Sequence, residues 1–336
     1  MISALVVISF LLSMCLTRIF ISPASWLRVM DHPNERSLHT IPVPRAGGVA
    51  ILVAFLVGMG MVAFFLGLVV NPILLVCALL VAVVSFLDDC YSLSAALRFF
   101  IHFCAALILV VNGYALSVLE LPGLSWAWPE SIAVVISCLM VVWLINLYNF
   151  MDGIDGFAAG MAIVGFSCFA LLAWQAQHLL FMSANMIVVA AVAGFLWFNF
   201  PPAKIFMGDA GSSTLGFLVA AFSLWASAEK IFPIWVALLV FSPFIVDASV
   251  TLLRRLFQGE KIWEAHKSHF YQRLVLVGWG HKKTVLCAYV LMVVCSATAW
   301  FAMQVDVTFQ WMIIMAWLVA YVLMMIGVVK LARQYA

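Results

Sequence analysis

Long apolar stretches follow one another along this chain and are separated by short polar segments. A membrane-spanning helix needs about 20 mostly apolar residues, so each stretch predicts one span. Strands of a β-barrel would instead alternate apolar and polar residues. The pattern therefore predicts an all-α polytopic membrane protein, with residues 1–336 forming a single integral membrane domain. Eleven stretches fit a span: 2–22, 46–69, 72–87, 98–118, 131–148, 157–175, 178–198, 212–228, 232–253, 284–304 and 309–330.

The composition excludes a soluble protein. Apolar residues make up 67% of the 336 residues and charged residues 9%, whereas ordinary globular domains have about 45–50% and about 25%. Most of the eight Cys residues lie within apolar runs, where a free Cys acts as a small hydrophobic side chain. Because no CxxC pair occurs, we expect neither a disulfide framework nor a zinc site.

The basic residues gather on one side of the predicted spans. With the N-terminus placed outside, Lys230 is the only one of the 16 Lys and Arg residues on the outer side. Lys and Arg are enriched in cytoplasmic loops, so we expect a periplasmic N-terminus and a cytoplasmic C-terminus. Most acids fall on the same inner side, which places the expected active site in five cytoplasmic loops: 23–45, 88–97, 149–156, 199–211 and 254–283.

Two adjacent carboxylates, Asp88 and Asp89, close the third span at the cytoplasmic boundary. They repel each other and are poorly solvated there, so a divalent cation or a basic partner would stabilise them. Negative charge at a helix C-terminus opposes the helix dipole, so capping does not explain the pair. The structural alternative is a helix end that meets water and pairs with Arg98.

The segment NLYNFMDGIDG presents Asn146, Asn149, Asp152 and Asp155 at intervals of three. If the helix continues through this segment, successive members are neighbours on a slowly drifting face. Their oxygen atoms suit a hard metal ion, a ribose or a phosphate. Polar groups at the end of a span are costly unless they face water or a ligand. The alternative is an interfacial turn built on the Asp-Gly pairs.

A third polar segment, FNFPPAKIFMGDAGSSTLG, places Asp209 in a turn just before the eighth span. Ser212 or Ser213 would cap that helix, whose free N–H groups favour anions. Lys204 adds a positive charge nearby. An ordinary N-cap is the structural alternative for Asp209 and the serines.

The longest inner loop contains GEKIWEAHKSHFYQRL, in which His266 and His269 would share one face of a helix. The neighbouring cations and the lack of thiols favour contacts to an oxyanion, such as a pyrophosphate, over a transition metal. A basic loop that touches anionic lipid is the alternative. In the first inner loop, Arg45 is expected where a lipid phosphate would lie, with Arg36 and His39 assisting it, and anchoring by the positive-inside rule is the alternative.

Two further polar residues lie near the same boundary. Asp247 precedes Arg254 by about two helical turns on one face, which fits a structural ion pair and a functional role equally well. His281 follows the last inner loop and is expected at the membrane interface.

Together these segments predict an enzyme that handles a phosphorylated substrate at the inner membrane surface. Carboxylates and amides suit Mg²⁺, which usually lies between carboxylates and substrate phosphates. Arg, Lys and His suit the phosphates themselves. The rival class, a secondary transporter, would place ionisable groups near mid-membrane and show broken helices in related halves. This chain places its acids at the boundary instead.

Four segments, DDCYSLSAALR, NLYNFMDGIDG, FPPAKIFMGDAGSSTLG and HKSHFYQRL, resemble the cytoplasmic motifs of the polyprenyl-phosphate N-acetylhexosamine-1-phosphate transferases. These enzymes are glycosyltransferases of the family 4 type. PRAGG and HKSHFYQRL look most like bacterial members that initiate O-antigen synthesis for lipopolysaccharide. The resemblance implies an active site facing the cytoplasm of a bacterial inner membrane.

The reaction that this resemblance implies consumes undecaprenyl phosphate and a UDP-N-acetylhexosamine, and it yields undecaprenyl-diphosphate-sugar and UMP with Mg²⁺ or Mn²⁺. N-acetylfucosamine, GlcNAc and N-acetylquinovosamine stay open as sugars. GlcNAc-1-phosphate transfer for an enterobacterial-type or teichoic-acid linkage lipid is the nearest alternative. A homodimer also stays open, and we expect no nucleic-acid partner.

The resemblance further implies roles for individual residues. Asp209 would ligate the metal with Asp152 or Asp155. Asp88 would accept a proton from the lipid phosphate, and Asp89 would support it or contact the metal. Because a phosphate monoester is mostly dianionic at neutral pH, positioning is the alternative role for Asp88, and a covalent aspartyl intermediate is also left open. The donor and the phosphates would be bound by seven residues: Arg45, Asn146, Asn149, Asp155, Lys204, His266 and His269.

Overall fold

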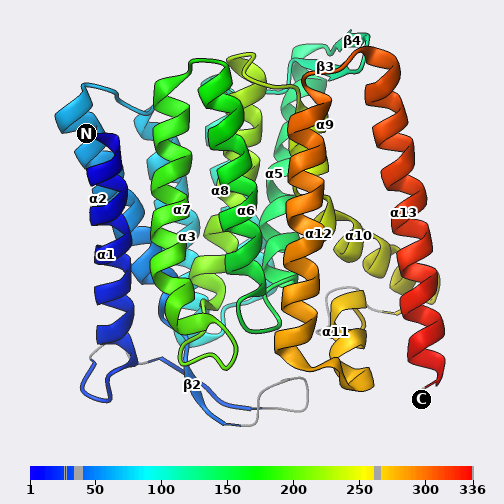
Figure 1. Cartoon of the computed structure of the whole chain (residues 1–336). Coiled ribbons are helices and arrows are strands. Elements are labelled where there is room, and N and C mark those ends of the chain that lie inside the picture. Colours follow the sequence, from blue (N-terminus) through cyan, green and yellow to red (C-terminus); the bar gives the residue numbers. More distant parts are fainter. Residues whose placement is uncertain (26, 28, 34–40, 261–265, 335–336) are drawn as a thin grey trace.

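Long helices stand side by side in this computed structural model, which describes residues 1–25, 27, 29–33, 41–260 and 266–334 (Figure 1). Arg36 and His39 lie outside the described residues. The first helices are α1 (Ile2–Ile21), α2 (Gly47–Leu66), α3 (Pro72–Tyr91), α4 (Ala95–Leu109, with an irregular last turn to Tyr114) and α5 (Glu130–Phe150). The later ones are α6 (Phe157–Gln175), α7 (Leu179–Asn199), α8 (Gly208–Ala228), α9 (Ile234–Val240), α10 (Ser242–Phe257), α11 (Phe270–Leu274), α12 (Gly280–Ala302) and α13 (Val307–Gln334).

The helical membrane architecture predicted from the hydropathy pattern is confirmed. Ten of the described helical segments are long and apolar enough to cross a membrane, and α9 with α10 supplies an eleventh if the bent pair counts as one span. The two chain termini lie at opposite ends of the bundle (Figure 1). We call the end that carries the C-terminus, at the bottom of Figure 1, the C-terminal end.

The ninth span is bent rather than straight, because α9 and α10 meet at an angle of 81°. Pro243 lies in the first turn of α10 and has no N–H group to donate to the carbonyl of Leu239. The hydroxyl of Ser242 donates to that carbonyl instead, at 2.6 Å. The Ser-Pro pair therefore ends α9 without leaving this buried carbonyl unpaired.

Two short antiparallel ribbons are the exceptions to the all-α pattern among the described residues. Strands β1 (Met30–Asp31) and β2 (Val43–Pro44) pair at the C-terminal end of the bundle. Strands β3 (Val118–Leu121) and β4 (Leu124–Ala127) form a hairpin at the other end. The first ribbon brings the start of α2 to the end of the bundle where the predicted site residues lie.

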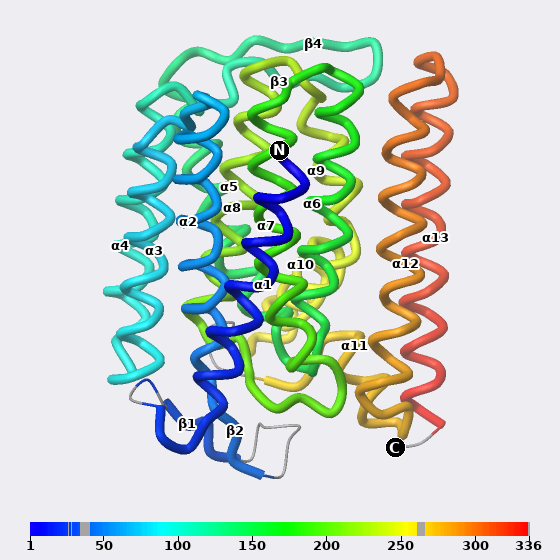
Figure 2. The backbone as a smooth tube through the Cα atoms, turned by 60° about the vertical axis from the view of Figure 1, so that its left-hand side comes forward, coloured from blue at the N-terminus to red at the C-terminus, as the bar shows by residue number. Residues whose placement is uncertain are grey.

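Helix α8 forms the centre of the bundle. Of its most apolar stretch, 94% of the residues are buried, compared with 6% for α13. Small residues allow this close packing: a Cβ at Gly48 of α2 would collide with the backbone of Gly211, and one at Gly216 would collide with the backbone of α5. Helices α12 and α13 stand at one edge of the bundle (Figure 2).

Several predicted boundaries move by a turn, and this changes the setting of site residues. Helix α3 extends to Tyr91, so Asp88 and Asp89 lie in its last turn. Helix α8 begins at Gly208, so Asp209 lies in its first turn and not in a preceding loop. The prediction that Ser212 or Ser213 caps this helix is wrong, because both are buried within it.

Candidate active site

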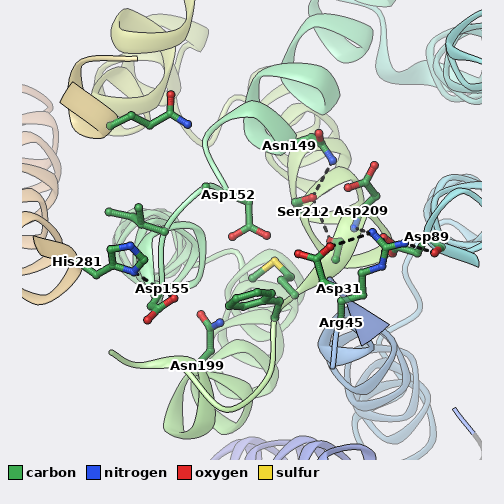
Figure 3. Close-up of a pocket in the computed structure, with 16 residues that line it drawn as sticks. Asp31, Arg45, Asp89, Asn149, Asp152, Asp155, Asn199, Asp209, Ser212 and His281 are labelled. Carbon is green, nitrogen blue, oxygen red and sulfur yellow. Dashed lines mark hydrogen bonds and ion pairs between the residues drawn. The ribbon is translucent and has the colours of Figure 1, made fainter. Parts of the chain in front are cut away.

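A pocket of about 220 Å³ opens among the loops at the C-terminal end of the bundle. Figure 3 shows Asp155 and His281 on one side of it, Asp89, Asp209 and Arg45 on the other, and Asp152 between them. Five carboxylates therefore line one cavity although they come from four separate segments: Asp31, Asp89, Asp152, Asp155 and Asp209.

Asp89 fixes the first turn of α8. Its buried carboxylate accepts hydrogen bonds from the backbone N–H groups of Asp209, at 3.2 Å, and Ala210, at 3.1 Å. A carboxylate is stabilised at a helix N-terminus by the helix dipole. The guanidinium of Arg45 lies 3.7 Å from the same carboxylate and donates to the Asp89 carbonyl. Asp89 is thus the cap that holds Asp209 in place, and its expected contact with a metal stays a prediction.

The PRAGG segment, residues 44–48, pairs through its backbone with the residues that precede α8. The N–H groups of Gly47 and Gly48 donate to the carbonyls of Phe206, at 3.1 Å, and Met207, at 2.8 Å. The N–H of Phe206 returns a bond to the carbonyl of Pro44, at 2.7 Å. Since the backbones meet this closely, the glycines are required by packing, and they bring Arg45 to the pocket.

Arg98 joins two carboxylates from different helices. Its Nη1 donates to Asp88 and lies 3.3 Å from Oδ2 of Asp209. Asp88 also accepts the backbone N–H of Leu93, at 2.7 Å. The Asp88–Arg98 pair weighed as the structural alternative is therefore confirmed. Asp88 lies outside the set of pocket-lining residues, and its side chain interacts with Asp209 directly as well as through Arg98. Its role as proton acceptor stays a prediction.

The NLYNFMDGIDG segment is helical only in part, because α5 ends at Phe150. Asn149 faces the pocket and donates to the hydroxyl of Ser212, at 3.1 Å. Asn146 instead donates to the carbonyl of Val142 in its own helix, at 2.7 Å, so the structure places it away from the pocket. The predicted continuous face is therefore wrong beyond Asn149.

Asp152 lies in the loop between the two ends of the pocket (Figure 3). Burial, and then the negative charges of Asp209, Asp89 and Asp155, raise the pKa of Asp152 well above its ordinary value. A carboxyl in this setting favours a proton or a bound cation.

Asp155 and His281 form a pair at the far end of the pocket. The Asp155 carboxylate lies 3.3 Å from Nδ1 of His281 and accepts the backbone N–H of Ala203, at 3.1 Å. The sequence pattern predicts His281 at the membrane interface, which stays a prediction, and it does not predict that His281 lines the pocket. No local motif carries this information, because the partners lie 126 positions apart in the chain and meet only in the folded bundle.

Of the predicted phosphate-binding residues, Arg45 lines this pocket, whereas Lys204, His266 and His269 do not. Lys204 is exposed and lies outside the lining set. His266 and His269 also lie outside it, although their rings come within 4.8 Å of each other. The helix expected to align them is not present, since α11 begins only at Phe270. Burial and the nearby His269, Arg255 and Arg254 lower the pKa of His266 to about 4.

Asp247 organises the last loop. It accepts the N–H groups of Phe270, at 2.9 Å, and Tyr271, at 3.0 Å, and its carboxylate lies 3.2 Å from Nδ1 of His269. Arg254 donates to the carbonyl of Ser268 at 3.1 Å. The predicted Asp247–Arg254 ion pair is therefore replaced by a cap on α11.

The sequence of this chain is similar to those of known proteins. A family model described as glycosyl transferase family 4 matches residues 71–227, which include Asp88, Asp89 and Asp209. A protein of Bacillus subtilis (strain 168), named a probable undecaprenyl-phosphate N-acetylglucosaminyl 1-phosphate transferase, is 31% identical over 89% of this chain and 87% of its own length. The chain belongs to glycosyl transferase family 4.

Further relatives carry related names. A decaprenyl-phosphate N-acetylglucosaminephosphotransferase of Mycobacterium tuberculosis (strain ATCC 25618 / H37Rv) is 32% identical over 79% of this chain and 74% of the relative. The undecaprenyl-phosphate alpha-N-acetylglucosaminyl 1-phosphate transferase of Escherichia coli (strain K12) is 26% identical over 80% of this chain and 74% of the relative. This family 4 member is thus a transferase with many membrane-spanning helices.

The donor atoms of this family 4 site fit one kind of metal. Among the described residues, no three His, Cys, Asp or Glu side chains form a group that would hold a metal ion alone. Asp152 and Asp209 do face one cavity, beside the amide of Asn149. Mg²⁺ takes one or two carboxylates and completes its shell with water and substrate phosphates, so the residues fit an ion that binds together with a phosphorylated substrate.

Proposed function

We propose that this protein transfers GlcNAc-1-phosphate from UDP-GlcNAc to undecaprenyl phosphate and releases UMP. An oxygen of the lipid phosphate forms a bond to the sugar-linked phosphorus, and the bond from that phosphorus to the UMP oxygen breaks. The observation that carries the proposal is the setting of Asp209, which Asp89 and Arg98 hold in the lining of a carboxylate-rich pocket.

We propose Asp209 and Asp152 as the ligands of Mg²⁺, with Mn²⁺ as the alternative ion. When bound, the ion neutralises phosphate charge and orients the reacting oxygens. Asp89 acts through Asp209, since it binds the backbone of the first turn of α8. Arg45 supplies a positive charge at this end of the pocket, where it would bind phosphate oxygens of the substrates.

Asp88 acts in this proposal by positioning Arg98. The lipid phosphate is mostly dianionic at neutral pH, so its attack needs little help from a base. Arg98 spans Asp88 and Asp209, and it keeps the Asp209 carboxylate in a fixed orientation. Loss of Asp88 would free the guanidinium and leave Asp209 less ordered.

The hydrocarbon chain of the acceptor is assigned to a second cavity. A groove of about 390 Å³ lies among α10, α11, α12 and α13 and is lined almost entirely by apolar side chains. Tyr271 lines it, and the Tyr271 hydroxyl donates to the carbonyl of Phe150, at 3.2 Å, where α5 ends. The next residue, Gln272, lines the carboxylate pocket. A chain in the groove would therefore have its phosphate next to the pocket.

The names of the relatives favour GlcNAc as the sugar, because all three carry it. N-acetylfucosamine and N-acetylquinovosamine rest on the PRAGG and HKSHFYQRL segments alone. The product would begin a cell-envelope glycan, with O-antigen as one destination. The basic residues favour a cytoplasmic location for the pocket in a bacterial inner membrane.

Purified protein in detergent tests this proposal. Undecaprenyl phosphate, Mg²⁺ and a UDP-sugar with a labelled sugar are incubated, and label is counted in the organic-extractable lipid. UDP-GlcNAc, UDP-N-acetylfucosamine, UDP-N-acetylquinovosamine and UDP-MurNAc-pentapeptide are compared. The proposal requires UDP-GlcNAc to be the fastest donor and EDTA to stop transfer. A faster second sugar would replace GlcNAc, and no lipid label from any donor would reject the activity.

A further inference from the structure

The last helix, α13, is held to the bundle by few contacts. Within α13, all of which is described, Tyr321 is the one buried residue. The exposed fraction of its side chain is 8%, whereas Leu318 and Val322 beside it are more than half exposed. A tyrosine hydroxyl is costly to bury among lipid-facing helices unless it has a hydrogen-bond partner.

Tyr321 reaches the bend of the ninth span. Its hydroxyl lies 2.7 Å from the Oγ atom of Ser242, which is the first residue of α10 after the bend. The thiol of Cys295 in α12 lies 3.4 Å from the same hydroxyl. One buried polar cluster thus joins three separate elements, namely the bend, α12 and α13.

The same tyrosine lines the apolar groove. Six groove residues come from α13, and they run from Tyr321 to Leu331. Ten residues of helix correspond to a wall about 15 Å long. Pro243, which follows the bend, lines the groove as well. The Tyr321–Ser242 bond therefore fastens the wall of the groove at the level of the bend.

We infer that Tyr321 is a positioning residue for the hydrocarbon chain of the lipid acceptor: bound to Ser242, it pins α13 across the groove. The inference rests on the proposed function only in naming the occupant. Loss of the bond frees α13 to move away from α10, so the chain loses one wall of its site. Nucleotide-sugar binding is expected to be unaffected, because neither Tyr321 nor Ser242 lines the carboxylate pocket.

Two substitutions remove the bond from opposite sides, Tyr321→Phe and Ser242→Ala. Thr298→Val is the matched control, because Thr298 accepts the indole N–H of Trp317 at 2.9 Å, another bond between α12 and α13, and lies outside the groove lining. Binding of labelled undecaprenyl phosphate is measured directly in detergent for each protein, and KM for UDP-GlcNAc and kcat are measured at saturating lipid.

We expect each groove variant to weaken lipid binding roughly two- to tenfold, the effect of one buried hydrogen bond. Ser242→Ala also removes the bond to the Leu239 carbonyl, so the double variant should bind no more weakly than Ser242→Ala alone, which has already lost the bond to Tyr321. Thr298→Val should bind like the wild type, and KM for UDP-GlcNAc should not move. Unchanged lipid binding in both single variants, additive losses, or an equal loss in Thr298→Val would overturn the inference. Because binding is measured without turnover, a wild type that binds lipid but transfers no sugar would reject the proposed activity alone.

Discussion

Helices α8 and α13 both cross the bundle, but they are built by opposite rules. Helix α8 is the less apolar of the two and is 94% buried over its most apolar stretch, while α13 is more apolar and 6% buried. Lipid solvates apolar side chains well, whereas close helix packing needs small residues and paired polar groups. Of these two helices, the more apolar one is therefore the more exposed, and the helix that carries Asp209 is the one rich in small and polar residues.

Gly48→Ala should have the largest effect, because it disrupts the close packing of α2 against α8. The added Cβ would collide with the backbone of Gly211, which has no flexible end to move aside. We expect loss of the folded, monodisperse protein in detergent chromatography. Gly60→Ala in the same helix and Gly327→Ala in α13 are matched controls, because a Cβ there would meet no described atom within 4 Å. Equal behaviour of all three variants would contradict the packing account.

Asp89→Ala should have the second-largest effect, a loss of both stability and activity. It removes the carboxylate that caps α8, which costs about 0.5–2 kcal/mol for a helix cap, and it releases the first turn that carries Asp209. We expect a lower melting temperature and at least about a tenfold loss of kcat. Asp89→Asn keeps an oxygen acceptor, so its melting temperature should recover more than its kcat. An Asp89→Ala protein with wild-type stability would show that the cap contributes nothing.

Asp88→Asn separates positioning from proton transfer. If Asp88 only orients Arg98, kcat should fall about tenfold or less while the pH profile of kcat keeps its shape. A general base would instead contribute roughly a hundredfold or more and remove the acidic limb of the profile. Measuring kcat from pH 5.5 to 8.5 decides between the two roles.

Asp152→Asn should give the smallest effect, a rise in melting temperature whose size depends on pH. The raised pKa of Asp152 means that the folded protein holds this proton more tightly than the unfolded chain does. Stability is therefore lost as the pH rises through the folded pKa. Without Mg²⁺, the variant should melt higher than the wild type at pH 7.5, and the gap should narrow as the pH falls towards the ordinary pKa of an Asp side chain. Excess Mg²⁺ should narrow it as well. A wild type that gains stability as the pH rises would contradict this assignment.

The helices were predictable because apolar runs of one membrane thickness leave little choice of structure. The motif residues Asp89, Asn149, Asp152, Asp155 and Asp209 do meet in one pocket. The bend of the ninth span was hidden in a continuous apolar run. Its signal was the Ser242-Pro243 pair, since a proline within a helix leaves one carbonyl unpaired.

Predictions that residues at a helical spacing would share one site were wrong. Asn146 has the right interval, but it donates to its own helix, while His281 has no motif and lines the pocket. The spacing of His266 and His269 predicts a shared helical face, yet they meet through a loop that Asp247 caps. Such pairings depend on how separate helices pack, which one segment of sequence does not encode.

Asp209 carries the central claim, so UMP release by Asp209→Asn is the most direct test. Wild type and variant, matched for melting temperature and elution in detergent, are given UDP-GlcNAc, undecaprenyl phosphate and Mg²⁺. The account predicts that the wild type releases UMP only when lipid and metal are both present, and that the variant loses at least about a hundredfold in kcat. A folded Asp209→Asn protein that releases UMP at the wild-type rate would contradict it.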